Sequence, residues 1–460
     1  MNPQADASHR VWHGHPYGMF LVAFTELWER FSYWGLAGLL VLFLTATTSA
    51  GGWGWDLSTA VKFYGWYGGM AFALPVVGAW LANNLLGERR GILWGGMAIM
   101  SGHLMLAVSL FGPQILRFAS ITKTNQWFEV LAVRPTFMLG LLLIVLGTGL
   151  LKPAISSIVA RLYPESGVRR DEGFAYFFVG IYIGSLLGAL VAGGLGERFG
   201  WHYGFGAAAV GMAAGLACYL AKQGSWLGDI GRAPGKRSES PGRTLTLVEK
   251  QRIAVIGVQG IFTVLYAVGF YQMFGMLNLY ARDELNRGVG TFVVPTTWMQ
   301  TVNLWAFFVF VPTLAWLWRR LSLQRSNPSA SYKLAFGLGA LAMGYLILVG
   351  VEDLRGDAKP YFLWLVATYV MFGLGDALVW ANQISLTSKL APPHYASFLV
   401  GGWYVCIGLG TVLTGYVGSL VAGHSYRYAF VALAVGCGGA AAVLACLTPI
   451  LKIYMHGVEE

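Results

Sequence analysis

The feature that most constrains this chain is a series of twelve long apolar segments. Each holds about 20 residues or more, the length that a helix needs to cross the hydrocarbon core of a bilayer. They cover approximately 18–45, 63–86, 91–112, 136–162, 173–195, 203–221, 253–280, 296–318, 332–350, 361–388, 396–422 and 428–451. Backbone polar groups in lipid must be paired within the segment, so these segments predict helices. We therefore expect an all-α polytopic membrane protein.

The composition agrees with lipid as the solvent. Only 11% of the residues are charged and 56% are apolar, whereas soluble domains carry about 25% charged residues. The 62 glycines lie throughout the apolar runs, where small residues let transmembrane helices approach each other closely. The four cysteines all lie in apolar runs, at spacings that fit neither a disulfide framework nor a metal site. We expect no bound metal.

The longest polar connection divides the chain into six predicted helices on each side. It covers about 222–252 and is rich in basic residues, glycine and proline, a composition that favours irregular structure. We predict an N-terminal six-helix bundle over 1–221, a cytoplasmic linker over 222–252, and a C-terminal six-helix bundle over 253–460.

The distribution of lysine and arginine predicts the orientation. With the N-terminus in the cytoplasm, the inner segments hold 19 of these residues and the outer loops hold 10. Basic loops on the cytoplasmic side of a membrane explain the net charge of +10 better than nucleic-acid binding does. Residues 1–18 show no signal-peptide cleavage pattern, so we expect them in the mature protein. Both termini are predicted to be cytoplasmic.

Five ionisable residues fall within the predicted spans. They are Glu26, Glu29, Arg30, Lys152 and Asp376. An Asp, Lys or Arg at the centre of a transmembrane helix costs about 2.5–3.5 kcal/mol on insertion scales. Such residues normally face a cavity or each other, and they indicate function.

The first span carries the densest charge pattern. Glu26, Glu29, Arg30 and Tyr33 recur at a spacing that places them on one helix face. Two carboxylates and one guanidinium cannot pair one to one, so one carboxylate needs a proton or a second cation. Lys152 is the candidate for that cation, because it is the only other buried cation that we expect in the chain. The alternative is a static ion-pair cluster that joins two helices, but buried ions are poor stabilisers. A proton relay is the favoured interpretation.

Asp376 is the one acidic residue in a predicted span of the second half. One interpretation is a protonated carboxyl, or one bonded to a neighbouring amide such as Asn382 or Gln383. We favour an acid that faces a cavity opposite Arg30 and Lys152, since walls of opposite charge suit a zwitterionic ligand. His103, isolated in the third span, is interpreted as a helix-packing group with its hydrogen bonds satisfied.

With these motifs in place, the chain resembles the proton-coupled oligopeptide transporter (POT/PTR) family of the major facilitator superfamily, as a divergent bacterial-type member. The first span reads Glu26-x-x-Glu29-Arg30-Phe31-x-Tyr33-x-Gly35. Further matches in the same order are Tyr64-Gly65-Trp66-Tyr67, Gly147-x-Gly149-x-x-Lys152-Pro153, Gln300 with Asn303, Ser388-Lys389-Leu390-Ala391-Pro392, and Gly402-Trp403. The resemblance covers most of the chain.

The resemblance implies the major facilitator fold, with twelve helices in two bundles, and import of di- and tripeptides with protons by alternating access. It assigns proton coupling to Glu26, Glu29, Arg30 and Lys152. It implies peptide contacts from Arg30, Tyr33, Tyr67, Lys152, Asn303 and Trp403. Asp376 occupies the position where the family usually has a Glu that meets the peptide amino group.

Several positions depart from the family pattern. Tyr182 replaces an Asn that contacts the peptide backbone, and Ala154 replaces an Asn after Lys-Pro. Ala37 and Tyr271 replace an Arg and an acid that form an outer salt-bridge gate, so we expect that gate to be absent. We keep Tyr182 and Tyr271 as candidate substrate-binding residues. The linker of about 30 residues is too short for the two extra helices of many bacterial members.

We therefore expect a transporter and not an enzyme, since no nucleophile or metal set accompanies the buried charges. The expected partners are small peptides, protons as the coupling ion, and membrane lipid, without nucleic acid or another cofactor. The expected form is a functional monomer in a bacterial-type inner membrane. The alternatives are a family relative that carries another small anion or zwitterion, and a non-transporting membrane receptor.

Overall fold

The computed structural model describes residues 11–118, 133–163, 168–234, 245–324 and 326–458. Twelve helical spans in these residues are long and apolar enough to cross a membrane. Their bounds are Tyr17–Thr45, Leu57–Leu86, Glu88–Leu110, Arg134–Leu162, Glu172–Phe199, Trp201–Leu227, Leu247–Asp283, Thr296–Leu323, Ala330–Leu354, Leu363–Leu390, Ala396–Gly423 and Tyr426–Met455. The predicted fold class is confirmed. Residues 235–244 of the predicted linker lie outside the described residues.

The chain divides into two compact units. Unit 1 comprises residues 1–53 and 73–238, and unit 2 comprises residues 54–72 and 239–460. The helix α2 (Leu57–Leu81) belongs to both, because its first part groups with unit 2. That first part lies within the predicted N-terminal bundle over 1–221, and these domain bounds stay a prediction.

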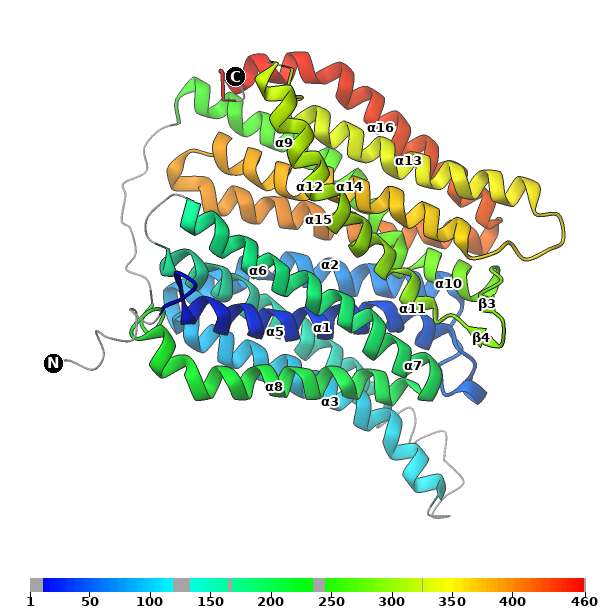
Figure 1. The fold of residues 1–460 in the computed structure, drawn as a ribbon. Helices are drawn as coiled ribbons and strands as arrows, with labels where there is room; N and C mark the ends of the chain where they lie inside the picture. The colour runs from blue at the N-terminus through cyan, green and yellow to red at the C-terminus, as the bar shows by residue number, and fades with distance from the viewer. Residues whose placement is uncertain (1–10, 119–132, 164–167, 235–244, 325, 459–460) are drawn as a thin grey trace. The chain divides into compact units, whose positions relative to one another are not determined.

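Unit 1 is built around α1 (Tyr17–Thr45), the long helix coloured blue in Figure 1. It packs against α6 (Val168–Leu187) and α8 (Trp201–Leu227), while α3 (Glu88–Phe118) packs against α5 (Arg134–Leu162) and α8. Most residues of α1 are buried, including Glu26, Glu29 and Arg30. The charged motif of the first span therefore lies in the interior of the protein.

Two glycines bring α6 and the turn after it directly onto the backbone of α1. A Cβ atom added at Gly184 would lie 2.1 Å from the Leu27 carbonyl oxygen, and one added at Gly188 would lie 2.3 Å from that of Phe31. Gly188 begins the π-helix η5 (Gly188–Gly193), which leads into α7 (Gly194–Phe199). This contact holds α6 against the same stretch of α1 that carries the charges.

Unit 2 contains α9 (Leu247–Phe270), α10 (Met276–Asp283), α11 (Thr296–Met299), α12 (Thr301–Leu323), α13 (Ala330–Leu354), α14 (Leu363–Leu390), α15 (Ala396–Gly418) and α16 (Tyr426–Met455). α13 packs against α14 and α16, α9 against α15, and α12 against α14. A capping box between Thr246 and Glu249 begins α9.

The seventh span is interrupted, although the sequence predicted a single helix over 253–280. The 3₁₀ turn η6 (Tyr271–Phe274) and the non-helical Gly275 separate α9 from α10. The side-chain amide of Gln300 donates to the Met273 carbonyl and also to Asn278 Oδ1, which lies beyond the interruption. A backbone group released inside an apolar core thus regains a partner.

Two small hairpins complete the described structure. β1 (Val11–Trp12) pairs with β2 (His15–Pro16), and β3 (Gly288–Val289) pairs with β4 (Phe292–Val293). The first hairpin turns at His13 and Gly14, both with positive φ, and runs into α1. The remaining short elements are the π-helix η3 (Ala82–Leu86) and the 3₁₀ turns η2 (Thr48–Ala50), η7 (Pro393–Tyr395) and η8 (Ser419–Gly423).

Candidate functional site

A buried charge cluster occupies unit 1. It consists of Glu26, Glu29, Arg30, Tyr33 and Lys152, and we call it the helix-1 cluster. Arg30 Nε lies 3.4 Å from Glu26 Oε1, and the same guanidinium pairs with the Glu29 carboxylate. All three side chains are buried. One cation thus serves two carboxylates.

Tyr33 connects the two cations of the cluster. The Arg30 Cζ atom lies 5.0 Å from the centre of the Tyr33 ring, and the Lys152 Nζ atom lies 5.5 Å from it. Both distances fall within the range of a cation–π contact. Lys152 belongs to α5 and is only partly buried, yet it lies close enough to Glu26 and Glu29 to interact with them electrostatically.

The cluster retains unused hydrogen-bonding capacity. Within the described residues, Glu26 Oε2 and Glu29 Oε1 are buried and have no hydrogen-bond partner. A buried carboxylate without sufficient partners is unfavourable, and it gains from taking up a proton or from a second cation. Uptake of a proton by one of these carboxylates would therefore change the ion pairs of the cluster.

A second cluster in unit 2 consists of Asp376, Trp380 and Trp403, and we call it the α14 cluster. Asp376 is 5% exposed, and Trp380 follows it one turn along α14. The Trp380 and Trp403 rings meet edge to face at 5.0 Å. In the part of the chain that the structure describes, Asp376 Oδ1 and Trp403 Nε1 are buried without a partner.

The structure gives Asn382 and Gln383 partners other than Asp376. Asn382 donates to the Leu378 carbonyl, and Gln383 donates to the Ala330 carbonyl. The proposed amide partners of the acid are therefore engaged elsewhere. This arrangement leaves the acid with an indole as its neighbour and an oxygen available for a ligand.

Asn303 adds a third polar group near the α14 cluster. Its backbone carbonyl would lie 2.7 Å from a Cβ atom added at Gly373, one turn before Asp376 on α14. Among the described residues, neither polar atom of its buried side chain has a hydrogen-bond partner. Tyr67 is also buried in unit 2, on the first part of α2.

Tyr271 packs into an aromatic cluster of unit 2. Its ring centre lies 5.2 Å from that of Phe72, 5.3 Å from that of Phe270 and 6.3 Å from that of Phe274. Ala37 is fully buried in α1, and Tyr182 is partly buried on α6. The structure thus shows packed apolar residues at the two positions where the family carries gate charges.

The candidate residues fall into two sets. Unit 1 holds Glu26, Glu29, Arg30, Tyr33, Lys152 and Tyr182, and unit 2 holds Tyr67, Tyr271, Asn303, Asp376 and Trp403. The structure brings the first five of unit 1 into one cluster. In unit 2, Trp403 contacts Trp380, which lies one turn along α14 from Asp376, and Asn303 lies beside the preceding turn.

Comparison with known proteins decides the family. The family model described as the POT family matches residues 89–231 and 245–432. The chain belongs to the POT family. This member is 30% identical to a protein named uncharacterized transporter YclF of Bacillus subtilis, over 97% of this chain and 96% of that protein. It is 27% identical to a di-/tripeptide transporter of Lactococcus lactis, over 86% and 88% of the two chains.

The fold comparison agrees with the family assignment. A crystal structure of a peptide transporter POT in complex with sulfate matches this POT family member with a TM-score of 0.87 at 25% identity. The match covers 99% of this chain and 100% of the other. The protein is therefore a multi-pass membrane protein of twelve transmembrane helices with the major facilitator fold.

Two predictions about single residues of this POT family member were wrong. Arg30 and Lys152 were predicted to be the only buried cations, but Arg89 and Lys333 are buried and Lys152 is only partly buried. Lys333 was counted as a loop residue, although it is the second residue of the predicted span 332–350. Its Nζ atom lies 4.8 Å from the centre of the Trp318 ring. His103 is buried, and neither ring nitrogen has a hydrogen-bond partner in the described residues, so it is not a satisfied packing group.

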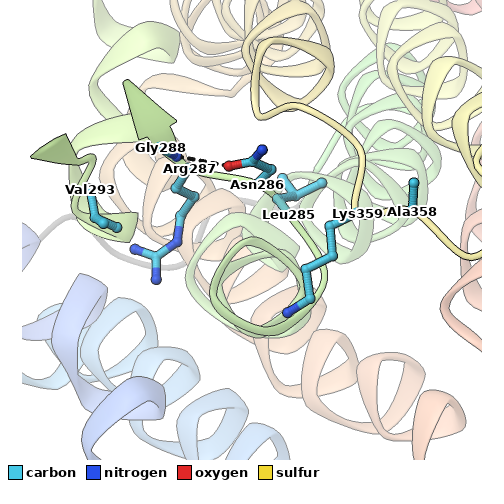
Figure 2. A pocket seen from close by; sticks show the side chains of 7 residues that line it. All are labelled: Leu285, Asn286, Arg287, Gly288, Val293, Ala358 and Lys359. Carbon is cyan, nitrogen blue, oxygen red and sulfur yellow. Dashed lines mark hydrogen bonds between the residues drawn. The ribbon is translucent and has the colours of Figure 1, made fainter. Parts of the chain in front are cut away.

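A surface pocket of about 550 Å³ lies in unit 2, away from the residues that the sequence motifs indicated. Figure 2 shows its lining residues, Leu285, Asn286, Arg287, Gly288, Val293, Ala358 and Lys359. Its two cations hold the surrounding loops together, since Arg287 donates to the Val294 carbonyl and Lys359 to the Asp283 carbonyl. We assign no ligand to it.

Proposed function

We propose that this POT family member is a symporter that imports di- and tripeptides together with protons. The observation that carries the proposal is the helix-1 cluster, in which Glu26 and Glu29 share the Arg30 guanidinium. The relationship to a di-/tripeptide transporter supports the substrate class. Protons are the only coupling ion in this proposal, and no other cofactor takes part.

The proton step follows from the charges of the cluster. Protonation of one carboxylate removes one of the two negative charges that hold Arg30. The two glutamates and Arg30 then carry no net charge, so that the helix-1 cluster is positive once Lys152 is included. A free substrate carboxylate then finds a cation that was previously engaged. Release of the proton restores the original pairing and expels the substrate carboxylate. In this scheme Lys152 and Arg30 bind substrate only while the cluster is protonated.

The α14 cluster supplies the complementary group. Asp376 is a buried acid with one oxygen that lacks a hydrogen-bond partner in the described residues. A primary ammonium group fits such an oxygen, because a charged donor forms a stronger bond to a carboxylate than a neutral donor does. We propose that Asp376 binds the α-amine of the peptide and that Trp403 and Asn303 contact its backbone.

The arrangement in the cell is part of the same proposal. The basic residues concentrate in the segments that are predicted to lie on the cytoplasmic side. We propose an inner membrane location of the bacterial type, with both termini in the cytoplasm. The functional form in this proposal is a monomer that contacts membrane lipid.

A second candidate is transport of another small anion or zwitterion. It is favoured by Tyr182 and Tyr271, which replace an amide and an acid of the family pattern. The aromatic packing around Tyr271 reduces the polarity of that region. A non-transporting receptor is the remaining alternative, in which the same charges would serve ligand binding without flux.

The test is uptake by the purified full-length protein in liposomes. An inward proton gradient should drive accumulation of a labelled dipeptide, and a protonophore should abolish it. Unlabelled dipeptides and tripeptides should compete, whereas single amino acids should not. Competition by an amino acid or another small zwitterion alone would favour the second candidate. Binding without any flux would overturn transport altogether.

A further inference from the structure

A histidine outside the helix-1 cluster joins three elements at one end of unit 1. His15 follows the turn of the β1–β2 hairpin and is only 3% exposed. Its Nδ1 atom lies 2.8 Å from the Tyr163 hydroxyl oxygen, and its Nε2 atom lies 3.6 Å from Glu172 Oε2. Tyr163 directly follows α5, and Glu172 belongs to α6. Both ring nitrogens therefore face a polar partner.

The hairpin fixes the place of this histidine. The backbone turns at His13 and Gly14 with φ of 47° and 81°, and β2 ends one residue before α1 begins at Tyr17. His15 therefore ties the start of α1 to the end of α5 and the start of α6. α1 is the helix that carries Glu26, Glu29 and Arg30.

Tyr163 is held tightly against α6. A Cβ atom added at Gly173 would lie 2.3 Å from the Tyr163 ring, so only glycine fits at this position. Burial, opposed in part by the Arg169 guanidinium, raises the pKa of Tyr163 to about 12. The hydroxyl therefore stays protonated at neutral pH and can either donate to His15 or accept from it.

The contacts differ between the two charge states of the histidine. A neutral ring can accept the Tyr163 hydroxyl proton at Nδ1. A protonated ring donates from both nitrogens, so it keeps a bond to the Tyr163 oxygen and adds an ion pair with Glu172. The described groups around it are Tyr163, Glu172 and the Tyr176 ring, with Arg169 near Tyr163. Glu172 is the acid among them, and it is the partner that only the charged ring pairs with.

We propose that His15, Tyr163 and Glu172 form a proton-sensitive clasp that holds the start of α1 and the start of α6 against the end of α5. Histidine changes charge between about pH 5 and pH 8 in proteins. Below this range the clasp includes the ion pair between His15 and Glu172, and above it only the hydrogen bond between His15 and Tyr163 remains. This pH response is independent of the proton step at the helix-1 cluster and does not rest on the proposed transport.

Hydrogen exchange of the full-length protein in lipid nanodiscs tests the clasp at pH 5.5 and pH 7.5. After correction for intrinsic exchange, amides of residues 17–24 and 173–180 should exchange about two- to fivefold more slowly at the lower pH, the range expected for a partly exposed ion pair. The change His15→Gln should remove this difference. Glu172→Gln keeps the hydrogen bond between His15 and Tyr163 but removes the ion pair. This variant should therefore also lose most of the pH difference in exchange.

The matched control is His13→Gln on the same hairpin. His13 is exposed and has no bond to Tyr163 or Glu172 in the described structure, so the pH difference should survive in this variant. The clasp is overturned if the wild-type protein shows no pH difference in these segments. It is equally overturned if the difference persists in both His15→Gln and Glu172→Gln. If His15→Gln does not fold, the result for Glu172→Gln decides.

Discussion

Glu26 and Arg30 lie one helical turn apart on α1, with Oε1 and Nε 3.4 Å apart and both side chains buried. The guanidinium is not reserved for Glu26, because it also pairs with Glu29. An arrangement selected only for rigidity would match one cation to one anion, since a surplus buried charge is costly. The second carboxylate therefore gives the helix-1 cluster a group that can take up a proton.

The first prediction concerns the two carboxylates. Glu26→Gln and Glu29→Gln should each abolish uptake driven by an inward proton gradient, while exchange of labelled for unlabelled substrate survives at least in part. An amide keeps the shape of the side chain but cannot take up the proton. Uptake and exchange in liposomes measure the two activities separately. Asp229→Asn is the control, because Asp229 is exposed. Gradient-driven accumulation in both variants would rule out the relay.

The second prediction concerns the cation on α5. Lys152→Ala should abolish gradient-driven uptake, because it removes a cation near Glu26 and Glu29 and a candidate group for the substrate carboxylate. Substrate with an amidated C-terminus should lose less affinity than substrate with a free one. Lys389→Ala at an exposed position of α14 is the matched control. Wild-type uptake by Lys152→Ala would reduce this residue to a packing role beside Tyr33.

The third prediction concerns recognition of the amine. Asp376→Asn should weaken peptides with a free α-amine by roughly 10- to 150-fold, as expected from the 1.5–3 kcal/mol of a hydrogen bond to a charged group. N-acetylated peptides should lose much less. Competition binding with matched pairs of free and acetylated dipeptides measures both. An equal loss for both ligand types would assign Asp376 a structural role.

Much of this architecture was predictable from the sequence, because the length of an apolar run and the charged residues within it can both be read from a short stretch of the chain. The twelve spans follow from apolar runs, and the shared face of Glu26, Glu29 and Arg30 follows from helical spacing. Lys333 could have been recognised in the same way, since it lies inside its predicted span. It was missed because its position near the helix end resembles that of a loop residue.

The helix interruptions could not be predicted, because they depend on partners that are distant in sequence. At the turn Tyr271–Phe274, the Met273 carbonyl accepts a hydrogen bond from Gln300, which lies between α11 and α12. The clasp at His15 likewise requires Tyr163, which lies 148 residues away. Hydropathy carries no information about such pairs. The substitution of Tyr for an acid at position 271 was visible, but the aromatic cluster around it was not.

The fourth prediction concerns closure of the outer side. The charged residues that follow Tyr271 at the end of the seventh span form ion pairs within unit 2, Arg282 with Asp283 and Glu284 with Arg355. Tyr271 instead packs against phenylalanine rings. Ion pairs exposed to water weaken with salt, whereas packed contacts do not. The open–closed equilibrium should therefore change little between low and high salt, and Tyr271→Phe should be tolerated.

Distance distributions between spin labels on the two units measure this equilibrium directly. A large shift with salt would contradict closure by packing. So would a double-mutant cycle that gives strong charge coupling between the first and seventh spans. Tyr271→Ala is the informative companion variant, because it removes the ring contacts and should shift the equilibrium where Tyr271→Phe does not.

The last prediction tests the packing that positions the helix-1 cluster. A Cβ atom at Gly184 would lie 2.1 Å from the Leu27 carbonyl oxygen, and a backbone atom cannot move aside as a flexible side chain can. Gly184→Ala should therefore push α6 away from α1 and destabilise the protein by about 1–3 kcal/mol, the usual cost of overpacking. Gly439→Ala on α16 is the control, since nothing lies within 4 Å of its added Cβ atom. Thermal unfolding in detergent should show a lower midpoint for Gly184→Ala alone. Equal midpoints for the two variants would mean that α6 does not lie on the α1 backbone, and the placement of the charged face of α1 would then be wrong.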